Sequence, residues 1–228
     1  MKILGIDTTT KFLSIGVYDG AKVYSYNLEV ARRLSSLLAP TIKRILDTLG
    51  WQASDIDYFA CGLGPGSFTG MRVGLATIKG LAWSLHKPII GISTLDILAR
   101  NVKAESVTII PMVDAKRNLI YCSVYKTEGS IQKRITPYLL LTEKEFLKKM
   151  RVKSIIFGDA VALYKENILR DKKNVAILDE DYWYPRGHNI IELALERIKQ
   201  KKFSDSFNTK PIYLYPKECQ IKNAKSKI

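Results

Sequence analysis

The sequence is poor in the side chains that usually bind metal ions. It has only two histidines, His86 and His188, which are far apart, and three cysteines without a C-x-x-C pair. Closely spaced pairs such as H-E-x-x-H, which hold a catalytic metal, are also missing. We therefore expect no metal site and no catalytic residues. His86 is expected at the C-terminal end of a helix, where a cation is favoured, and His188 in a loop.

The cysteines and the apolar segments also limit where the protein can work. Cys61, Cys122 and Cys219 are an odd number and far apart, so we interpret them as reduced thiols, mostly in the core. No apolar run reaches the roughly 18 residues of a membrane span, and the N-terminal residues become acidic at Asp7, too soon for a signal peptide. These absences predict a cytoplasmic protein with no membrane segment.

Positive charge, in contrast, is abundant. There are 36 Lys and Arg against 22 Asp and Glu, a formal net charge of +14. The excess is strongest towards the C-terminus, where a basic tail over 206–228 includes Lys217, Lys222, Lys225 and Lys227. Such a tail attracts phosphate backbones, although no RNP, KH or zinc-finger pattern accompanies it. An RNA-binding protein is therefore one alternative, and a solvated lysine-rich surface is the other.

The most distinctive stretch is glycine-rich and runs from Gly62 to Gly80. It follows an apolar run at 58–61 and leads into a segment rich in Ala, Leu and Ile, which predicts a strand, a loop and a helix over about 70–85. Ser67 and Thr69 are both suitable N-caps for that helix. The spacing fits neither a Walker loop, a dinucleotide-binding fingerprint nor a hydrolase nucleophile elbow.

The predicted helix has a face of small residues. Gly70 and Gly74 are four apart, and Thr77 and Gly80 lie on the neighbouring row. An internal glycine costs about 1 kcal/mol relative to alanine, which suggests a packing reason. Two interpretations stay open, namely packing against the helix's own sheet and close contact with the helix of another subunit.

Two matches within the chain indicate a duplicated lobe. Residues 6–18 and 113–125 align without a gap, each beginning with an apolar strand that ends in Asp, and residues 154–158 resemble 58–62 as a strand followed by glycine. We expect a first lobe at 1–103, a second at 104–205 and the basic tail at 206–228. The expected elements are strands at 2–7, 12–18, 23–27, 58–61, 88–92 and 212–214 and helices at 34–49, 70–85, 93–101, 142–150 and 189–202, with 171–188 irregular. The first three strands should form a meander, and Pro40 either starts or kinks the first helix. Thr142 with Glu145 and Asn189 with Glu192 are predicted to cap the last two helices.

Four segments carry a resemblance to a known family. The stretch from Gly64 to Ala82 (GPGSFTGMRVGLATIKGLA), together with residues 3–9, 91–95 and 211–214, resembles the TsaB (YeaZ) family. The resemblance implies an α/β, two-lobed, duplicated actin/sugar-kinase/Hsp70-like (ASKHA, RNase H-like) fold. It also implies a non-catalytic partner of TsaD in the complex that adds threonylcarbamoyl to adenosine 37 of tRNAs reading ANN codons.

The same resemblance implies a set of partners. They are TsaD in a heterodimer, a second copy of the chain in a homodimer, the ATPase TsaE, and tRNA indirectly through the complex. The interface is expected on the helices at 34–49 and 70–85, through Leu34, Leu37, Leu38, Gly70, Met71, Gly74, Leu75, Thr77 and Ile78.

A nucleotide-binding enzyme of the same superfamily is the main alternative. In nucleotide-using members, the turns beside the two lobe-opening aspartates contact phosphate and metal. Here Asp7, Thr8 and Asp114 occupy those turns, and Asp7 with Thr8 offers the oxygen ligands that a hydrated Mg²⁺ prefers. Neither turn contains glycine, and Asp7 is equally suited to accept hydrogen bonds from its own turn. We expect no tightly bound cofactor, and at most weak binding of ATP, ADP or Mg²⁺.

Overall fold

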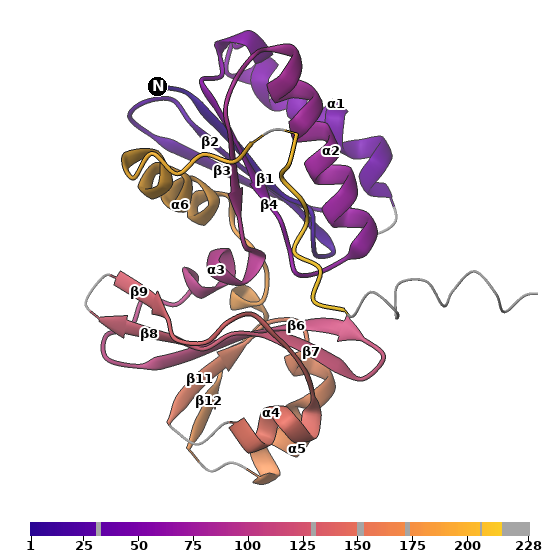
Figure 1. Ribbon diagram of the computed structural model, residues 1–228, viewed down its shortest axis with the longest axis vertical. Coiled ribbons are helices and arrows are strands. Elements are labelled where there is room, and N and C mark those ends of the chain that lie inside the picture. The colour runs from indigo at the N-terminus through magenta and orange to yellow at the C-terminus, as the bar shows by residue number, and fades with distance from the viewer. Residues whose placement is uncertain (31–32, 129–130, 150–152, 172–173, 206, 216–228) are drawn as a thin grey trace, which may run out of the picture.

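The computed structural model describes residues 1–228 except 31–32, 129–130, 150–152, 172–173, 206 and 216–228. It has two α/β lobes, one above the other in Figure 1. None of the described helices is long and apolar enough to cross a membrane.

The first lobe is built on a five-stranded sheet in the order β3-β2-β1-β4-β5. The expected three-strand meander forms, followed by two parallel strands: β1 (Ile3–Asp7), β2 (Phe12–Tyr18), β3 (Val23–Glu29), β4 (Tyr58–Gly62) and β5 (Ile89–Ile92). Two helices cover one face of this sheet, α1 (Leu34–Thr48) and α2 (Phe68–Ser84). Pro40 lies inside α1, so the helix does not start there.

The second lobe repeats this plan with additional strands. Its sheet has the order β10-β7-β6-β11-β12, with β8 pairing to β6 and β9, so β6, β7 and β11 stand where β1, β2 and β4 stand in the first lobe. The predicted duplication is therefore visible in the topology. The elements are β6 (Thr108–Lys116), β7 (Leu119–Cys122), β8 (Tyr125–Glu128), β9 (Ile131–Arg134), β10 (Leu139–Thr142), α4 (Glu143–Lys149), β11 (Ser154–Phe157), α5 (Val161–Asp171) and β12 (Val175–Ile177).

The last helix returns to the first lobe. α6 (Gly187–Lys199) packs on the face of the first sheet opposite α1 and α2, where Ile190, Ile191 and Ala194 are buried against Ile3 and Ala60. Figure 1 shows it beside β2 and β3. The expected second lobe at 104–205 is therefore wrong for this helix. An apolar helix stripe indicates packing on a sheet without specifying which sheet, so periodicity alone does not choose between the lobes.

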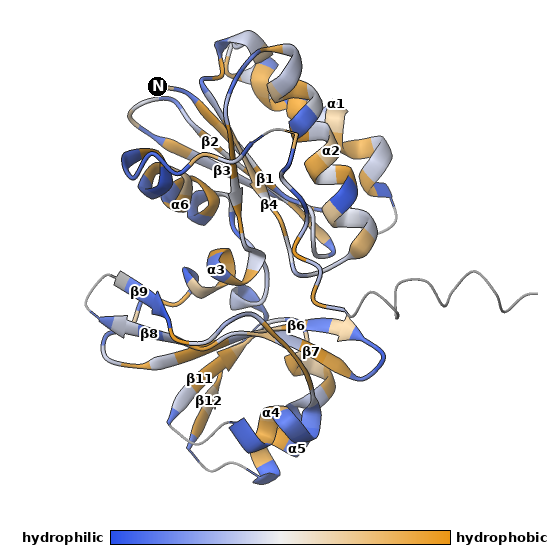
Figure 2. Ribbon diagram, viewed as in Figure 1, coloured by the Kyte–Doolittle hydropathy of each residue, from blue (hydrophilic) through white to orange (hydrophobic). Residues whose placement is uncertain are grey.

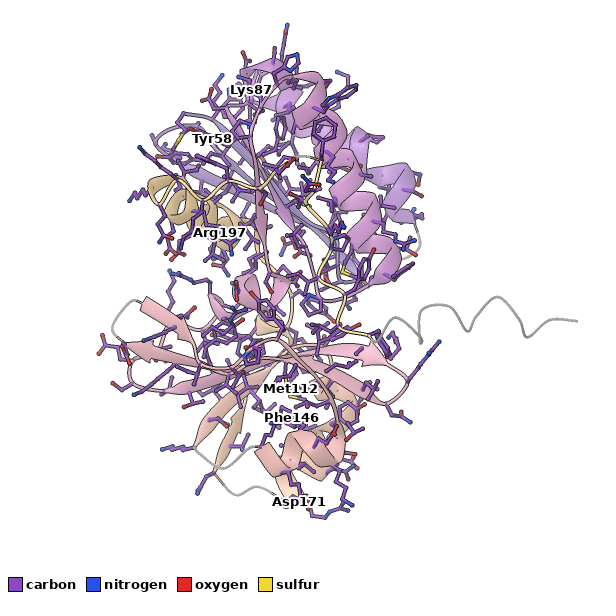
Figure 3. All side chains as sticks on the ribbon, in the orientation of Figure 1. Tyr58, Lys87, Met112, Phe146, Asp171 and Arg197 are labelled. Atoms are coloured by element: carbon purple, nitrogen blue, oxygen red, sulfur yellow. The ribbon has the colours of Figure 1, made fainter. Side chains whose placement is uncertain are left out.

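Apolar side chains fill the interior of each lobe. Figure 2 shows hydrophobic residues along the inner faces of the strands and helices. In the second lobe, Met112 and Phe146 lie between the sheet and α4, whereas Asp171 lies at the far end (Figure 3). The short α3 (Thr94–Ala99) packs against β6 and so joins the two lobes through a further apolar cluster.

Several sequence expectations need correction. The segment 171–188 contains β12 and a 3-10 turn at Glu180–Tyr182, and residues 212–214 form no strand. The final helix begins at Gly187, and Asn189 is buried inside its first turn instead of capping it. Thr142 and Glu145, however, form the predicted reciprocal cap: the Glu145 carboxylate accepts from the Thr142 N–H at 2.8 Å, and the Thr142 hydroxyl accepts from the Glu145 N–H at 3.3 Å.

Candidate functional site

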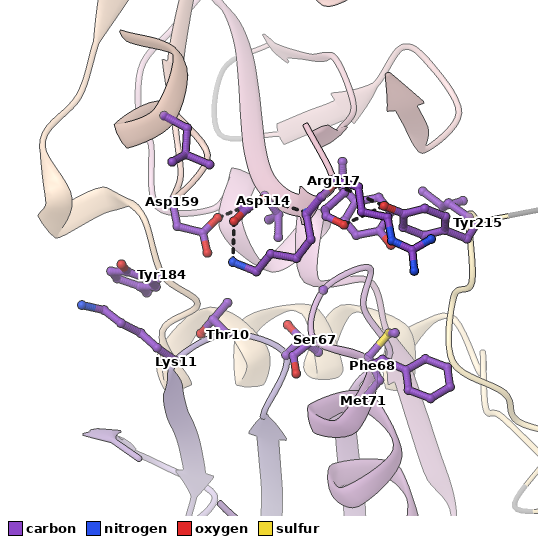
Figure 4. A pocket seen from close by; sticks show the side chains of 18 of the residues that line it. Thr10, Lys11, Ser67, Phe68, Met71, Asp114, Arg117, Asp159, Tyr184 and Tyr215 are labelled. Carbon is purple, nitrogen blue, oxygen red and sulfur yellow. Dashed lines mark hydrogen bonds and ion pairs between the residues drawn. The ribbon is translucent and has the colours of Figure 1, made fainter. Parts of the chain in front are cut away.

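A cleft of about 1010 Å³ lies between the two lobes. The turns after β1 and β6, the glycine loop and the start of α2 meet there, as Figure 4 shows from close by. Its lining includes Thr9, Thr10, Lys11, Gly66, Ser67, Phe68, Met71, Asp114, Lys116, Arg117, Tyr121, Asp159, Tyr184, Tyr213 and Tyr215. The size of the cleft and its mixture of apolar and polar lining side chains are suitable for a small ligand.

The glycine loop is folded against the turn that follows β1. The Ser67 N–H donates to the Thr9 carbonyl at 2.7 Å, and an added Cβ at Gly66 would lie only 2.5 Å from that oxygen. Gly64 has φ +91, which favours glycine. Ser67, one of the two predicted caps, accepts from the Gly70 N–H at 3.2 Å. The glycines therefore serve the close approach of two segments of the same chain.

Asp7 is sealed beneath this loop. Its carboxylate accepts from the N–H and hydroxyl of Thr9, both at 2.8 Å, and from the Thr94 hydroxyl at 2.7 Å. Its side chain is completely buried, and burial raises the pKa of Asp7 against the lowering effect of these hydrogen bonds. Asp7 thus links the end of β1 to the start of α3 and does not line the cleft.

Thr8 explains the small-residue face of α2. Its hydroxyl donates to the Gly70 carbonyl at 2.8 Å, and an added Cβ at Gly74 would collide with that hydroxyl. The expectation that Gly70 and Gly74 form an accessible face for a neighbouring subunit is therefore wrong, because Thr8 of the same chain fills the space. Thr8 is buried as well, so it contacts no ligand in the cleft.

Of the three residues predicted as possible ligands of phosphate or Mg²⁺, namely Asp7, Thr8 and Asp114, only Asp114 lines the cleft. Its carboxylate accepts from the Lys116 N–H at 2.7 Å and forms an ion pair with the Lys116 ammonium. The Asp114 N–H donates to the carboxylate of Asp159 at 2.8 Å (Figure 4). Burial, and secondarily the charge of Asp114, raises the pKa of Asp159. Asp159 was missed from the sequence, although it follows the glycine that the repeat identified, Gly158.

Cations and aromatic rings surround these carboxylates. Lys11 lies 5.1 Å from the centre of the Tyr184 ring, and Tyr184 packs against Phe12 with ring centres 4.7 Å apart. Lys116, Arg117 and the following Asn118 all have φ between 54 and 63, the left-handed region, without any glycine in the turn. The cleft therefore places basic side chains at its rim and acidic ones deeper inside.

The C-terminal segment closes one side of the cleft. The Ile212 N–H donates to the Leu63 carbonyl at 2.8 Å in the first lobe, and the Tyr215 hydroxyl donates to the Ala115 carbonyl at 2.8 Å in the second. Between them, the Tyr213 hydroxyl accepts from Arg72 of α2 at 3.0 Å. The segment resembled the end of a family motif, but its bridging position could not be read from a four-residue pattern.

Most of the predicted interface residues are buried inside the first lobe. Leu34, Leu38, Leu75 and Ile78 belong to its apolar core, whereas Met71 is buried beside the cleft. Leu37 and Thr77 are half-buried on the outer side of α1 and α2. Two further residues of α2 point outward: Gly80, where an added Cβ would meet no atom within 4 Å, and Trp83, which is 63% exposed.

The two histidines lie at the ends of helices, and neither lines the cleft. His86 is exposed directly after α2 with φ 53, as expected for a helix end. His188 is half-buried in the first turn of α6, not in a loop, and burial, together with Arg186 and Lys103, lowers its pKa. Among the described residues, His, Cys, Asp and Glu side chains form no group of three that could hold a metal ion.

Two of the three cysteines lie in the core, as predicted, and Trp183 is also packed inside the fold. Cys61 and Cys122 are buried, whereas Cys219 lies outside the described residues. Trp183 packs in the second lobe and donates to the Leu178 carbonyl at 2.9 Å.

Comparison with known proteins gives one matching family model and several relatives that match along most of the chain. Residues 28–167 match the family described as TsaD: tRNA N6-adenosine threonylcarbamoyltransferase. The chain is 28% identical to the tRNA threonylcarbamoyladenosine biosynthesis protein TsaB of Bacillus subtilis, with 97% of both chains covered. It is 30% identical to the protein of that name from Buchnera aphidicola subsp. Schizaphis graminum, over 83% of this chain and 90% of the relative.

The solved structures agree on the fold. A Pseudomonas aeruginosa protein described as similar to peptidase YEAZ superposes with a TM-score of 0.82 at 22% identity, covering 94% of this chain and 99% of that one. A second, described as YeaZ from the same organism, gives 0.80. The repeated order of the two sheets confirms the predicted two-lobed, duplicated α/β fold, and these solved structures share that fold. Residues 28–167 thus match the TsaD family model, and the relatives named TsaB match along most of the chain, one of them at 30% identity, so the chain belongs to the TsaB (YeaZ) family.

Proposed function

We propose that this chain takes part in making threonylcarbamoyladenosine in tRNA as a non-catalytic partner of a TsaD protein. The observation that carries the proposal is the match to proteins named for this biosynthesis over nearly the whole chain, at 97% coverage of both sequences for Bacillus subtilis TsaB. The modified base would be adenosine 37 of tRNAs that read ANN codons. The chain would hold TsaD in a competent geometry, while TsaD carries the reacting groups.

The state of the two lobe-opening aspartates supports a non-catalytic role. Asp7 is buried and already accepts three hydrogen bonds from Thr9 and Thr94. Asp114 is engaged by the backbone and the ammonium group of Lys116. Carboxylates occupied in this way have fewer free lone pairs for a hydrated magnesium ion or for a proton transfer.

The outer side of α1 and α2 is the surface we propose for TsaD. Thr77 and Gly80 leave the α2 backbone accessible there, and Trp83 offers a large exposed apolar side chain nearby. Small residues allow close helix contact, and tryptophan is a frequent anchor of protein interfaces. A second copy of the chain would use the same surface when TsaD is absent, and the ATPase TsaE would join the assembled complex.

Binding can be tested with a single bulky, charged residue on this surface. Gly80→Arg adds a side chain where nothing lies within 4 Å, so the monomer should fold normally. Leu163→Arg, at a residue 61% exposed on α5 of the second lobe, is the matched control. In size-exclusion chromatography with the TsaD protein of the same source, we expect Gly80→Arg to lose the complex and Leu163→Arg to keep it. A complex that survives Gly80→Arg would remove the proposed surface.

The non-catalytic role has its own test. We expect no threonylcarbamoyl transfer to tRNA from this chain alone with threonine, bicarbonate and ATP, and product, measured by mass spectrometry of nucleosides, only when TsaD and the other required proteins are added. Transfer by the chain without TsaD would overturn this part of the proposal.

A nucleotide-binding enzyme is the second candidate, favoured by the cleft itself. Its volume of about 1010 Å³ and the basic side chains of Lys11, Lys116 and Arg117 are compatible with a nucleotide. Calorimetry with Mg-ATP would support this candidate if binding heat is present and is lost in Asp114→Ala. No binding at millimolar nucleotide would exclude it. Asp7→Ala is a poor probe, because Asp7 is part of the core.

A further inference from the structure

A second pocket, with a volume of about 380 Å³, lies between the lobes and shares no lining residue with the cleft. The helices α3 and α6 form one wall, and the hairpin of β8 and β9 in the second lobe forms the other; Figure 1 shows α6 above this hairpin with α3 beside it. We call it the junction pocket. Its charged lining residues are Asp96, Arg100, Arg134, Glu196, Arg197 and Lys202.

Two of the four cations in the junction pocket are paired with acids. The Arg100 guanidinium lies 2.8 Å from the carboxylates of both Glu192 and Glu196. The Arg197 guanidinium, which Figure 3 shows on α6, lies 3.6 Å from the Asp96 carboxylate. These two arginines therefore hold α3 and α6 together, and their charges are compensated within the chain.

The other two cations have no acidic partner in the described part of the chain. The Arg134 guanidinium lies 3.9 Å from the centre of the Tyr138 ring, and neither Arg134 nor Lys202 forms an ion pair with another described residue. The Asp96 carboxylate already accepts from the Tyr125 hydroxyl at 2.7 Å and from the Tyr138 hydroxyl at 2.8 Å. Four cations against two carboxylates leave the lining with a net charge of +2, which attracts an anion.

The strand register turns Arg134 towards the junction pocket. β8 and β9 pair Tyr125 with Arg134 and Lys126 with Lys133. Partners across an antiparallel pair point to the same face of the sheet, and successive residues alternate between the two faces. Gln132 and Arg134 therefore share the face that lines the pocket, whereas Lys133 points to the other face and does not line it.

Gln132 adds an unpaired acceptor to the same pocket. Its side-chain NH₂ group donates to the Val102 carbonyl at 2.6 Å, and its Oε1 atom is buried with no hydrogen-bond partner among the described residues. The opposite orientation of the amide would bring two acceptors together, so the Oε1 atom stays unpaired. A buried acceptor without a donor is unfavourable, and a hydroxyl group of a ligand supplies the missing donor.

We propose that the junction pocket binds a small phosphate monoester that carries a hydroxyl group. Its phosphate is bound by Arg134 and Lys202, and its hydroxyl donates to Oε1 of Gln132. A phosphate group carries a charge of about −1.5 to −2 at pH 7, which matches the lining, whereas a carboxylate carries a single charge. Guanidinium and ammonium groups are the usual side-chain ligands of phosphate in proteins.

The ligand contacts both lobes at once. Gln132 and Arg134 belong to the second lobe, whereas Lys202 follows α6, which packs on the first. A bound phosphate monoester therefore stabilises one placement of the lobes relative to each other. The junction pocket shares no residue with the surface proposed for TsaD on α1 and α2, and binding is measured on the chain alone, so this inference can fail while the proposed function holds.

Isothermal titration calorimetry with glycerol 3-phosphate at constant ionic strength tests the site. Arg134→Gln removes a lining charge, and the matched control Lys133→Gln removes the same charge from the neighbouring residue on the other face of β9. Both residues are exposed, so both variants should fold. We expect the native chain and Lys133→Gln to bind with the same dissociation constant, and Arg134→Gln to bind about tenfold or more weakly, because a charge-assisted hydrogen bond is lost. No binding heat in the native chain at millimolar glycerol 3-phosphate, or equal weakening in both variants, would overturn the proposal.

A second ligand tests the role of Gln132. Methyl phosphate carries the same phosphate group without a free hydroxyl on its carbon, so it should bind the native chain about 2–10-fold more weakly than glycerol 3-phosphate. In Gln132→Met, which removes the acceptor, the two ligands should bind equally. Equal affinities in the native chain, or a difference that persists in Gln132→Met, would contradict the contact between the hydroxyl group and Gln132.

Discussion

Gly74 and Gly80 lie on the same helix, and alanine at each position should change stability in opposite directions. Both are internal to α2 (Phe68–Ser84), so each alanine gains about 1 kcal/mol of helix propensity. At Gly80 nothing else changes, because an added Cβ meets no atom within 4 Å. At Gly74 the same methyl group would collide with the Thr8 hydroxyl and lie 3.2 Å from the Thr8 Cβ.

The magnitude follows from what Thr8 would have to give up. Overpacking a filled site costs about 1–3 kcal/mol. Moving the Thr8 hydroxyl away from the Gly70 carbonyl, 2.8 Å distant and buried, costs about 1 kcal/mol more. After the propensity gain, Gly74→Ala should lower the free energy of unfolding by about 1–3 kcal/mol, whereas Gly80→Ala should raise it by up to about 1 kcal/mol. Gly74→Leu should fold poorly.

Urea denaturation of the two variants beside the native chain measures both changes. In thermal unfolding, each kcal/mol corresponds to roughly 2–4 °C for a chain of this size. The double variant Gly74→Ala with Thr8→Ser, which removes a methyl group near the collision, should recover part of the loss. If Gly74→Ala proved as stable as Gly80→Ala, the assignment of Thr8 as the residue that requires glycine at 74 would be refuted.

Three further predictions concern buried polar groups. Arg100 is 11% exposed and forms ion pairs with two half-exposed glutamates of α6, Glu192 and Glu196. Arg100→Ala should therefore lower the free energy of unfolding by about 1–2 kcal/mol, and Arg100→Lys should recover only part of that loss. Urea denaturation measures both changes, and an unchanged midpoint in Arg100→Ala would contradict the prediction. Burial raises the pKa of Cys122 from 9.0 to about 12, so the thiol ionises more easily in the unfolded chain and the folded state loses stability as pH rises through that interval. In a Cys219→Ser variant, the buried Cys61 and Cys122 should not react with Ellman's reagent at neutral pH until urea unfolds the chain. The pKa of Asp7 is also raised above 3.8, so the free energy of unfolding of the native chain should fall as pH rises above 3.8. Asn at position 7 does not ionise, so the difference in free energy of unfolding between the native chain and Asp7→Asn should become smaller over the same pH range. A difference that stays constant would contradict this prediction.

Local sequence patterns correctly predicted the structural features that depend on residues close together in the sequence. The reciprocal cap of Thr142 and Glu145, the cap at Ser67 and the whole of β2 all depend on residues within a few positions of each other. The gapless repeat predicted the matching topology of the two sheets, because a duplicated strand order leaves the same apolar spacing in both halves. Such features can be read directly from one sequence.

Contacts between residues far apart in the sequence could not be predicted from such local patterns. The spacing of Gly70 and Gly74 showed that something approaches α2 closely, but Thr8, the residue that does so, is 62 positions away from Gly70. For the same reason α6 was assigned to the wrong lobe, since its buried stripe fits a sheet and does not specify which one. Asp159 was overlooked because its role depends on the Asp114 N–H, 45 positions earlier.

The two lobes have kept one architecture but use their opening aspartates differently, and this difference shapes the cleft. In the first lobe Asp7 is covered by the glycine loop, because Gly62 approaches it so closely that an added Cβ would collide with its carboxylate. In the second lobe the equivalent Asp114 lines the cleft, paired with Lys116 beside the buried Asp159. An anionic ligand would have to draw Lys116 away from Asp114 and then tolerate two carboxylates, so its binding would be weakened by the charges already present. Asp114 and Asp159 thus weaken phosphate binding on the second lobe's side of the cleft, and the first lobe offers no accessible carboxylate there. Both features count against the nucleotide-binding candidate and in favour of the proposed non-catalytic role.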